Sequence, residues 1–493
     1  MPRANKLADW LWTLMACLWL ALFPLWQGGT YTSITRAKFE GMLLLTGASL
    51  LLALLAAIYA LLRREKLPFR LEWRQGVALA LFAWMALSAC CSPYRDTLNA
   101  SGQRAVWMGS LRYEGMATQL CYMALFLLMS LHPVRLKPVL YAAAAALVLF
   151  TGVVAAQYGG LNPLGLFPPG RSVHTNYEFQ GTIGNIDMVS GYLSLMVPLL
   201  LTAFLLAKKG GWLWYAAGIA GAALWCCMEV QSGLIVMLLC AGVAVVVMLL
   251  RAESRARGML VLAGIILAVA LRTALVLPWL DGGRYLLLDP GRATLALTAL
   301  AALALIGAWL LHRHPGRSFS GKTVAIAVGA ALVVCMVAFL LLPLTSADGG
   351  LWEIQQMLLG RAEDSFGSYR VAVWRHTLAI AQEHPFLGTG PDTFYYALED
   401  RLRALGTELP EIFDNPHNEY LAYAANCGFP AMGLYLLLLL ATLLRRARSH
   451  WPLLAATLGF ALQGFFSFSI CLVSPMWWVL LSMATEKKSF LRR

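Results

Sequence analysis

The sequence predicts an all-α, polytopic membrane protein of about twelve to fourteen transmembrane helices, with one long, mainly helical loop outside the cytoplasm. Of the 493 residues, 60% are hydrophobic and 13% are charged, whereas about 25% of an ordinary soluble chain is charged. Apolar runs near or above the roughly 18 residues needed to cross a bilayer recur along the chain. The Lys and Arg residues gather between alternate pairs of these runs, which is typical of a multi-pass protein.

About fourteen runs are expected to be membrane spans. The first run follows Arg3 and Lys6, as in a secretory signal, but it is long, rich in Trp and without a small-x-small cleavage site. We therefore expect an uncleaved first helix. The last two runs are predicted to form a tight hairpin. The spans are expected near residues 9–26, 41–62, 76–92, 116–131, 138–157, 185–206, 212–228, 231–250, 259–279, 292–311, 322–344, 425–444, 451–468 and 470–484.

The basic residues predict that both termini of this cell-membrane protein are cytoplasmic. With the N-terminus inside, 24 of the 38 Lys and Arg residues fall in cytoplasmic segments, 13 fall outside, and Arg272 falls within a span. The net charge of +13 therefore mainly reflects the predicted topology. The basic residues would also be attracted to anionic membrane lipids. The net charge gives little reason to expect a nucleic-acid partner.

Three parts of the chain are expected from this pattern. Residues 1–344 carry spans 1 to 11, residues 345–424 form the extracytoplasmic loop, and residues 425–493 carry the last three spans and a cytoplasmic tail. The loop contains twelve Asp or Glu, five Arg and no Lys. This charge pattern favours a solvated, folded subdomain over a segment held on lipid headgroups.

Helical spacing is visible inside the loop. Val371, Trp374 and Leu378 predict a helix from about Ser368 to Glu383, with one apolar face packed on the membrane domain. Two further helices are expected to open with a proline in the first turn, one at Pro391 and one at Pro416, the second capped by Asn415.

The cysteines give no reason to expect a metal or a disulfide framework. All ten lie in or at the ends of predicted spans, and none has the C-x-x-C spacing of a zinc or redox site. We expect no structural metal.

One motif match is interpreted as accidental. Residues 316–323, Gly-Arg-Ser-Phe-Ser-Gly-Lys-Thr, fit the phosphate-loop pattern G-x-x-x-x-G-K-[ST]. A phosphate loop follows a buried strand of a parallel sheet, whereas this segment joins two predicted spans across about a dozen residues. We interpret it as a basic cytoplasmic turn.

Three motifs in the loop resemble the O-antigen ligase and polymerase superfamily. An Arg-x-x-x-Trp helix lies within 367–374, a Pro-x-x-Gly-x-Gly-Pro turn within 384–394, and a His-Asn-x-Tyr-Leu segment within 414–421, in the order of that family. Residues 112–115 and 181–187 also resemble stretches of family members, especially those from Gram-positive bacteria.

The resemblance implies a metal-independent membrane glycosyltransferase of the GT-C type, without a cofactor. Its donor would be a polyprenyl diphosphate-linked glycan, and its acceptor a hydroxyl of a glycan or lipid-linked glycan. Physical reasoning supports this donor class, because no nucleotide sugar is supplied outside the cytoplasm. A lipid diphosphate needs forked cationic donors, which favours Arg over Lys.

One departure from the family concerns the diphosphate. Members often carry a Ser-Arg pair at the outer start of a mid-chain helix, and its arginine is assigned to the diphosphate. The corresponding residues 231–233 are Gln-Ser-Gly. Arg112, Arg171 and Arg272 are the candidate replacements.

Arg370 and His417 are the candidate catalytic residues that the resemblance selects. Arg370 would bind the diphosphate and stabilise the leaving group; the structural alternative is a surface arginine paired with Glu363 or Asp364. His417 would take the proton of the acceptor hydroxyl. It is expected in the first turn of a helix; the alternative is a solvated or capping histidine.

Further polar residues are candidates for substrate binding. Arg361 and Arg375 are weaker cationic candidates, and Asn418 and Glu419 would orient His417 or serve the helix start. Asp392 follows Pro391 in an expected first helical turn, where capping explains a carboxylate as well as catalysis does. Charged residues near outer span ends or within a span are expected to be paired or to face a cavity; these are Glu114, Asp187 and Arg272.

Two other classes of protein are compatible with many apolar helices. A transporter or lipid flippase would show paired repeats with Gly- or Pro-broken helices, which the sequence lacks. It would also have less reason to keep a hydrophilic loop of about eighty residues. The third class is a non-catalytic assembly or sensor protein. Ligase and polymerase share the donor chemistry and stay open here, as do the sugar and the oligomeric state.

Overall fold

The computed structural model describes residues 3–64, 72–168, 179–228, 230–275, 290–314, 316–345, 349–444 and 450–485. The described residues are mostly helical, and the chain forms two compact units, Met1–Leu195 with Val373–Arg493, and Met196–Ala372. A two-stranded antiparallel hairpin, β1 (Phe179–Gln180) with β2 (Gly184–Asn185), precedes α8. The division of the chain predicted at residues 344 and 424 remains a prediction.

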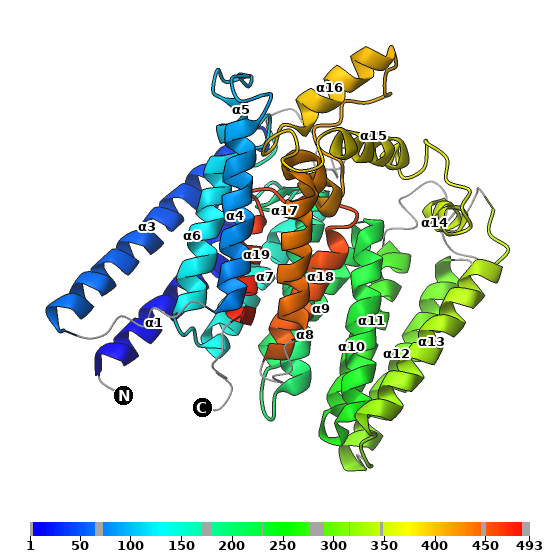
Figure 1. Cartoon of the computed structure of the whole chain (residues 1–493). Helices are drawn as coiled ribbons and strands as arrows, with labels where there is room; N and C mark the ends of the chain where they lie inside the picture. The colour runs from blue at the N-terminus through cyan, green and yellow to red at the C-terminus, as the bar shows by residue number, and fades with distance from the viewer. Residues whose placement is uncertain are drawn as a thin grey trace. The chain divides into compact units, whose positions relative to one another are not determined.

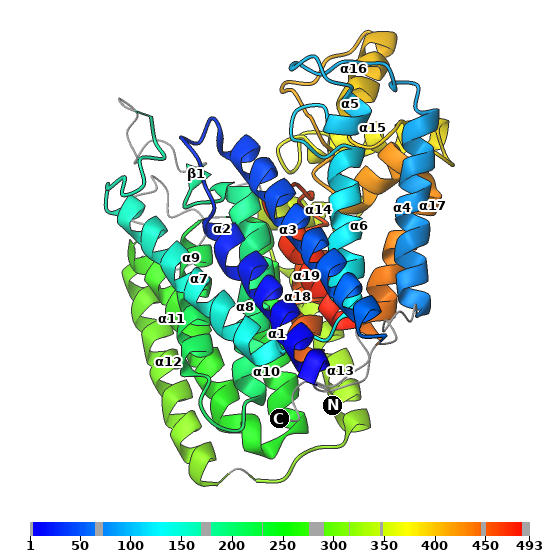
Figure 2. The same cartoon turned by 90° about the vertical axis from the view of Figure 1, so that its left-hand side faces the viewer.

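Helices of the first unit run side by side, with α5, α15 and α16 at one end (Figures 1 and 2). α4 packs on α17, and α6 packs on α3, α4 and α19. The helices of this unit are α1 (Arg3–Cys17), the π-helical turn Leu18–Leu22, α2 (Phe23–Leu25), α3 (Ile34–Leu62), α4 (Trp73–Cys91), α5 (Ala105–Met108), α6 (Met116–Leu131), α7 (Leu136–Tyr158), the start of α8 (Ile186–Leu206), most of α15 (Arg370–Glu383), α16 (Phe394–Leu405), α17 (Glu419–Leu443), α18 (Trp451–Gln463) and α19 (Ser474–Thr485).

The second unit is built around α11 (Arg255–Leu275), which packs on α9 (Trp212–Cys227), α10 (Gln231–Leu250) and α12 (Pro290–Arg313). α13 (Gly321–Leu341) packs on α10, and α14 (Gly350–Leu358) follows it. α13 opens with Ser320 as N-cap, whose side chain accepts from the Thr323 N–H at 3.2 Å. A helix, α12, lies before this segment in place of the strand of a phosphate loop, which agrees with its interpretation as a turn.

Every predicted span corresponds to a helix, but not every helix is long enough to cross a bilayer. Among the described residues, nine helices have the length and hydropathy of a span: α3, α4, α7, α8, α10, α11, α12, α13 and α17. The others are shorter; α19, for example, has 12 residues and is about 18 Å long. The predicted count of fourteen spans is therefore not confirmed.

α19 shows why an apolar run overstates a span. All its residues from Ser474 to Ala484 are buried. Trp478 is 1% exposed and contacts the rings of Phe82, Tyr122, Phe126 and Tyr435. A helix that is apolar all round is buried by lipid or by protein, and hydropathy alone does not distinguish the two. The predicted tight hairpin before α19 is also wrong, because residues 464–473 separate it from α18.

Lys38 lies three residues before the predicted start of the second span. In the structure α3 begins earlier, at Ile34, so Lys38 is part of this helix and is fully buried. Its Nζ donates to the carbonyls of Phe23 at 2.6 Å and Pro24 at 2.9 Å, at the end of α2. The side-chain nitrogen therefore satisfies carbonyls at the end of α2.

Candidate functional site

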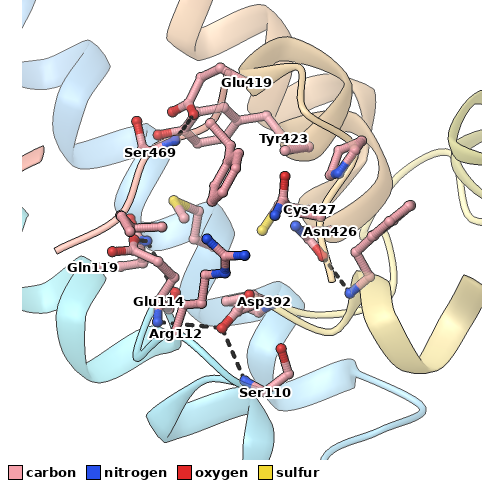
Figure 3. A pocket seen from close by; sticks show the side chains of 18 of the residues that line it. Ser110, Arg112, Glu114, Gln119, Asp392, Glu419, Tyr423, Asn426, Cys427 and Ser469 are labelled. Carbon is pink, nitrogen blue, oxygen red and sulfur yellow. Dashed lines mark hydrogen bonds between the residues drawn. The ribbon is translucent and has the colours of Figure 1, made fainter. Parts of the chain in front are cut away.

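A polar cavity of about 80 Å³ lies in the first unit (Figure 3). Four carboxyl groups and one guanidinium contribute to its lining. They come from the turn before α6, the loops before α16 and α17, and the start of α17. The polar residues of the lining are Ser110, Arg112, Glu114, Gln119, Tyr122, Asp392, Asp414, Asn415, Glu419, Tyr423, Asn426 and Ser469.

Asp392 holds the turn that carries Arg112 and Glu114. Its carboxylate accepts hydrogen bonds from the N–H groups of Ser110 at 3.0 Å and Glu114 at 3.3 Å. Gly109, with φ +92°, lies so close that a Cβ there would stand 2.6 Å from the Asp392 carboxylate. Asp392 was expected in the first turn of a helix, but it has φ +56° and α16 begins two residues later, so that prediction is wrong.

Arg112 extends from this turn and contacts the segment before α17. Its guanidinium donates to the Asp414 carboxylate and lies 4.9 Å from the ring centroid of Phe468. About a third of the Arg112 side chain is exposed. An arginine held by one carboxylate keeps further N–H donors for a phosphate group, because the guanidinium carries five.

Burial favours the protonated forms of Asp392 and Glu114. Burial raises the pKa of Asp392 to about 7, against the opposing effect of the two N–H donors. Burial also raises the pKa of Glu114 well above its ordinary value, although Glu114 accepts a bond from the Tyr122 hydroxyl at 2.7 Å. A cavity with protonated acids offers donors as well as acceptors to a sugar, and its net charge is less negative than its composition indicates.

One face of α17 lines the cavity. Glu419, Tyr423, Asn426 and Cys427 recur at helical spacing and point to the same side. Asn418 is the N-cap, since its side chain accepts from the N–H groups of Tyr420 at 3.1 Å and Leu421 at 3.0 Å. The Glu419 carboxylate accepts from the Ser469 N–H at 2.5 Å.

The glycine-rich turn 385–390 fixes α17 and α16 by backbone contact. The N–H groups of Thr389 and Gly390 donate to the carbonyls of Ala425 at 3.0 Å and Asn426 at 2.7 Å. Gly388, with φ +63°, would place a Cβ 2.4 Å from the Asn426 backbone. The Asn426 Oδ1 accepts from the Phe394 N–H at 3.0 Å, at the start of α16. The motif therefore needs glycine for close approach as well as for its dihedral angles.

His417 lies beside the cavity, in the same segment as lining residues Asp414 and Glu419. Its ring packs edge to face on Phe468, which lines the cavity, with centroids 5.1 Å apart. It was expected in a first helical turn capped by Asn415; instead φ is +49°, the cap is Asn418, and Asn415 accepts the His417 N–H at 2.9 Å. Pro416 also lies before α17, because the turn closed by the Asn415 side chain lies between it and the helix.

α15 matches the predicted helix closely, from Arg370 to Glu383. Its predicted apolar face is partly wrong, since Leu378 is 41% exposed, while Thr377 and Ile380 are buried. Trp374 does contact the loop before α17, because its Nε1 donates to the Pro416 carbonyl at 2.9 Å. Arg375 is an exposed residue of this helix.

The remaining candidates are not among the described residues that line this cavity. Asp187, at the start of α8, lines a second, smaller cavity described below. Arg272, Arg361 and Arg370 belong to the second unit. The side chains at 231 and 232 and the whole of Arg171 lie outside the described residues.

Sequence reasoning missed several lining residues, including Gln119, Tyr122, Asp414, Tyr423 and Asn426. A polar pattern in α17 was available, since positions 419, 423 and 426 follow helical spacing in an otherwise apolar segment. Gln119 and Tyr122 contact Glu114, which lies five and eight residues before them in the turn that precedes α6. Their spacing of three residues in an apolar helix was the available pattern.

These features define a multi-pass, helical membrane protein with a polar cavity that contains an arginine and four acids. Residues 285–436 match the family model of O-antigen ligase. The match confirms the resemblance to the O-antigen ligase and polymerase superfamily, and it supports a role in polysaccharide assembly by glycosyl transfer. No curated protein matches the chain. Arg112 and Glu114 precede the matched segment, but they share the cavity with its residues Asp392, Asp414 and Glu419.

Proposed function

We propose that the chain transfers a glycan from a polyprenyl diphosphate to an acceptor hydroxyl outside the cytoplasm, as a ligase or a polymerase. The observation that carries the proposal is the meeting of Arg112 with the acids of the family-matched loop in one cavity. In the transfer, the acceptor oxygen bonds to the anomeric carbon as the bond from that carbon to the diphosphate oxygen breaks. The bonding electrons leave with the lipid diphosphate.

Arg112 supplies a forked cation to the departing diphosphate, and its guanidinium is partly exposed in the cavity. This assignment fits the missing Ser-Arg pair, for which Arg112 was a candidate. Arg370 is proposed as a second cation, from the Arg-x-x-x-Trp motif. Positive charge aimed at a developing anion stabilises the transition state directly.

His417 is proposed to accept the proton of the acceptor hydroxyl and to pass it to solvent. Its position between the cavity residues Pro416 and Glu419 and against Phe468 supports this role. The protonated forms of Asp392 and Glu114 that burial favours make those groups donors to sugar hydroxyls. Asp392 also positions Arg112, through the turn that it holds.

The proposal includes metal independence, because arginine supplies the charge that a divalent ion provides in other transferases. Among the described residues, no group of three or more His, Cys, Asp or Glu is arranged to hold a metal ion.

The test is a transfer assay with purified protein in detergent. The donor is the lipid-linked glycan extracted from cells that lack the gene, and the readouts are labelled product and free polyprenyl diphosphate. We expect both products to appear together and to persist in EDTA. Loss of activity in EDTA with rescue by Mg²⁺ or Mn²⁺ would contradict metal independence. Movement of intact donor across a vesicle membrane without cleavage would instead identify a flippase.

A further inference from the structure

A second cavity, of about 10 Å³, shares the lining residues Glu419, Phe468, Ser469 and Ile470 with the first. This volume holds about one water molecule or one hydroxyl group. The cavity is framed by the start of α8, the end of α18 and the segment 464–474. Its polar lining consists of Asp187, Glu419, Gln463, Ser467, Ser469 and Ser474.

Gln463, the last residue of α18, gives this cavity an unsatisfied polar group. Its side chain is 2% exposed, and neither Nε2 nor Oε1 has a hydrogen-bond partner among the described residues. A buried amide without partners is costly, because it loses its bonds to water and gains none in return. Such a group in a native structure calls for an explanation, and a bound ligand or an ordered water is one.

Hydrogen bonds fix the backbone segments around the Gln463 side chain. The Glu419 N–H donates to the Gly464 carbonyl at 2.7 Å, and the Tyr420 hydroxyl donates to the Ala461 carbonyl at 2.6 Å. These bonds join the end of α18 to the start of α17. The small cavity is therefore part of the same rigid site as Glu419.

The chemistry of the lining selects the ligand. Among the described residues that line the second cavity, the charged groups are Asp187 and Glu419, both acids, and none is Lys or Arg. A phosphate is therefore disfavoured, whereas a hydroxyl, which donates and accepts, matches the two ends of an amide. Arg112, the cation assigned to the diphosphate, lines only the larger cavity.

We propose that Gln463 binds a hydroxyl of the acceptor sugar in the second cavity and determines acceptor specificity. The sugar ring occupies the larger cavity, and one hydroxyl reaches past Glu419 to the Gln463 amide. This inference rests on the proposed function and names its acceptor subsite. Gln463 is a specificity residue in this role and takes no part in proton transfer.

The first experiment compares Gln463→Leu with wild type in the transfer assay. We expect the acceptor KM to rise on the order of tenfold, as for loss of one hydrogen bond to a well-placed hydroxyl, with donor KM unchanged. Monodeoxy analogues of the acceptor sharpen the test. For one analogue, the acceptor KM of wild type should rise by the same factor, whereas that of Gln463→Leu should change little. If wild type is active and Gln463→Leu has the same acceptor KM, the inference is overturned but the proposed function stays intact.

Binding and stability provide readouts that do not need transfer. Methyl glycosides of common hexoses serve as probes, and we expect at least one to raise the Tm of wild type but not of Gln463→Leu. Equal shifts for both proteins, or none, would refute the subsite. Absence of transfer by wild type would overturn the proposed function alone, since this measurement still decides the subsite.

A matched variant controls for folding. Gln157 is also buried, but its Nε2 donates to the Tyr31 hydroxyl at 2.9 Å and its Oε1 accepts from the Gly181 N–H at 2.8 Å. Gln157→Leu should lower Tm, because it leaves the Gly181 N–H without its acceptor and removes a donor to the Tyr31 hydroxyl. Gln463→Leu should leave Tm without ligand unchanged or raise it, because it removes an unsatisfied group. A fall in Tm equal to that of Gln157→Leu would show that Gln463 is structural and would contradict the proposal.

Discussion

The guanidinium of Arg112 donates to the carboxylate of Asp414, 302 positions further along the chain. The first residue lies before the family-matched segment and the second lies within it. This pair joins the turn before α6 to the segment before α17, and both residues line the same cavity. The chemistry proposed for the loop therefore depends on a residue far upstream of it.

Replacement of Arg112 should weaken donor use. We expect Arg112→Ala to raise the donor KM and lower kcat, because a diphosphate loses its forked partner, and Arg112→Lys to restore only part of the activity. Arg104→Ala is the matched control, since Arg104 pairs with Asp96 on the exposed surface. Steady-state kinetics over donor concentration measure the effect; equal kinetics for Arg112→Ala and Arg104→Ala would contradict the assignment.

His417 and Arg370 are assigned to different steps and should separate in a binding assay. His417→Ala should still bind the lipid diphosphate but transfer about 10² to 10⁴ times more slowly. Arg370→Ala should lose binding and transfer together, and Arg370→Lys should recover part of both. Full turnover by folded His417→Ala would show that the proton leaves by another route, such as Glu419, Asp392 or solvent.

Asp392 should contribute stability that is lost as pH rises from about 4 to about 7. In the folded protein Asp392 keeps its proton up to a pKa of about 7, whereas an Asp in the unfolded chain releases it near 4. The folded state then binds more protons in this window, so acidification stabilises it. Asp392→Asn should reduce the fall in Tm between these two pH values by a few degrees, on the order expected for one group. Asp96→Asn, at an exposed carboxylate, should keep the wild-type slope; an unchanged slope in Asp392→Asn would reject this cause.

Two glycines with the same φ should differ in their tolerance of alanine. Gly388 and Gly406 both have φ +63°, but a Cβ at 388 would stand 2.4 Å from the Asn426 backbone, and one at 406 would meet nothing within 4 Å. Gly406→Ala should cost about 1–2 kcal/mol for its dihedral angle alone. Gly388→Ala should cost more than about 3 kcal/mol, because α17 must move away from the turn. Thermal unfolding in detergent compares them, and similar losses would mean that the close contact does not control stability.

Reporter fusions test the topology that the mechanism needs. Fusions at Arg70, Lys209 and Arg448 should report the cytoplasm, and a fusion near Glu408 should report the outside. A cytoplasmic result at Glu408 would end the proposed function, because the cavity would face nucleotide sugars rather than lipid-linked donors on the outer side.

The sequence by itself determined the helical membrane class, the extent of α15, the start of α10 and the three motifs of the loop. Each of these depends on local information, namely hydropathy, helical spacing or the order of residues within a short segment. Hydropathy did not determine the number of spans, because a helix such as α19 is equally apolar when protein surrounds it.

Only the tertiary structure decided the composition of the site. It brought Arg112 to Asp414 and Asp392 to the turn at Ser110, and it made Asn418 rather than Asn415 the cap of α17. It also left the amide of Gln463 buried in a cavity beside Glu419. Contacts between distant segments depend on how the helices pack, and the residue spacing within any one segment does not encode this packing. Packing also decides which side chains are buried, and burial sets the pKa of Asp392.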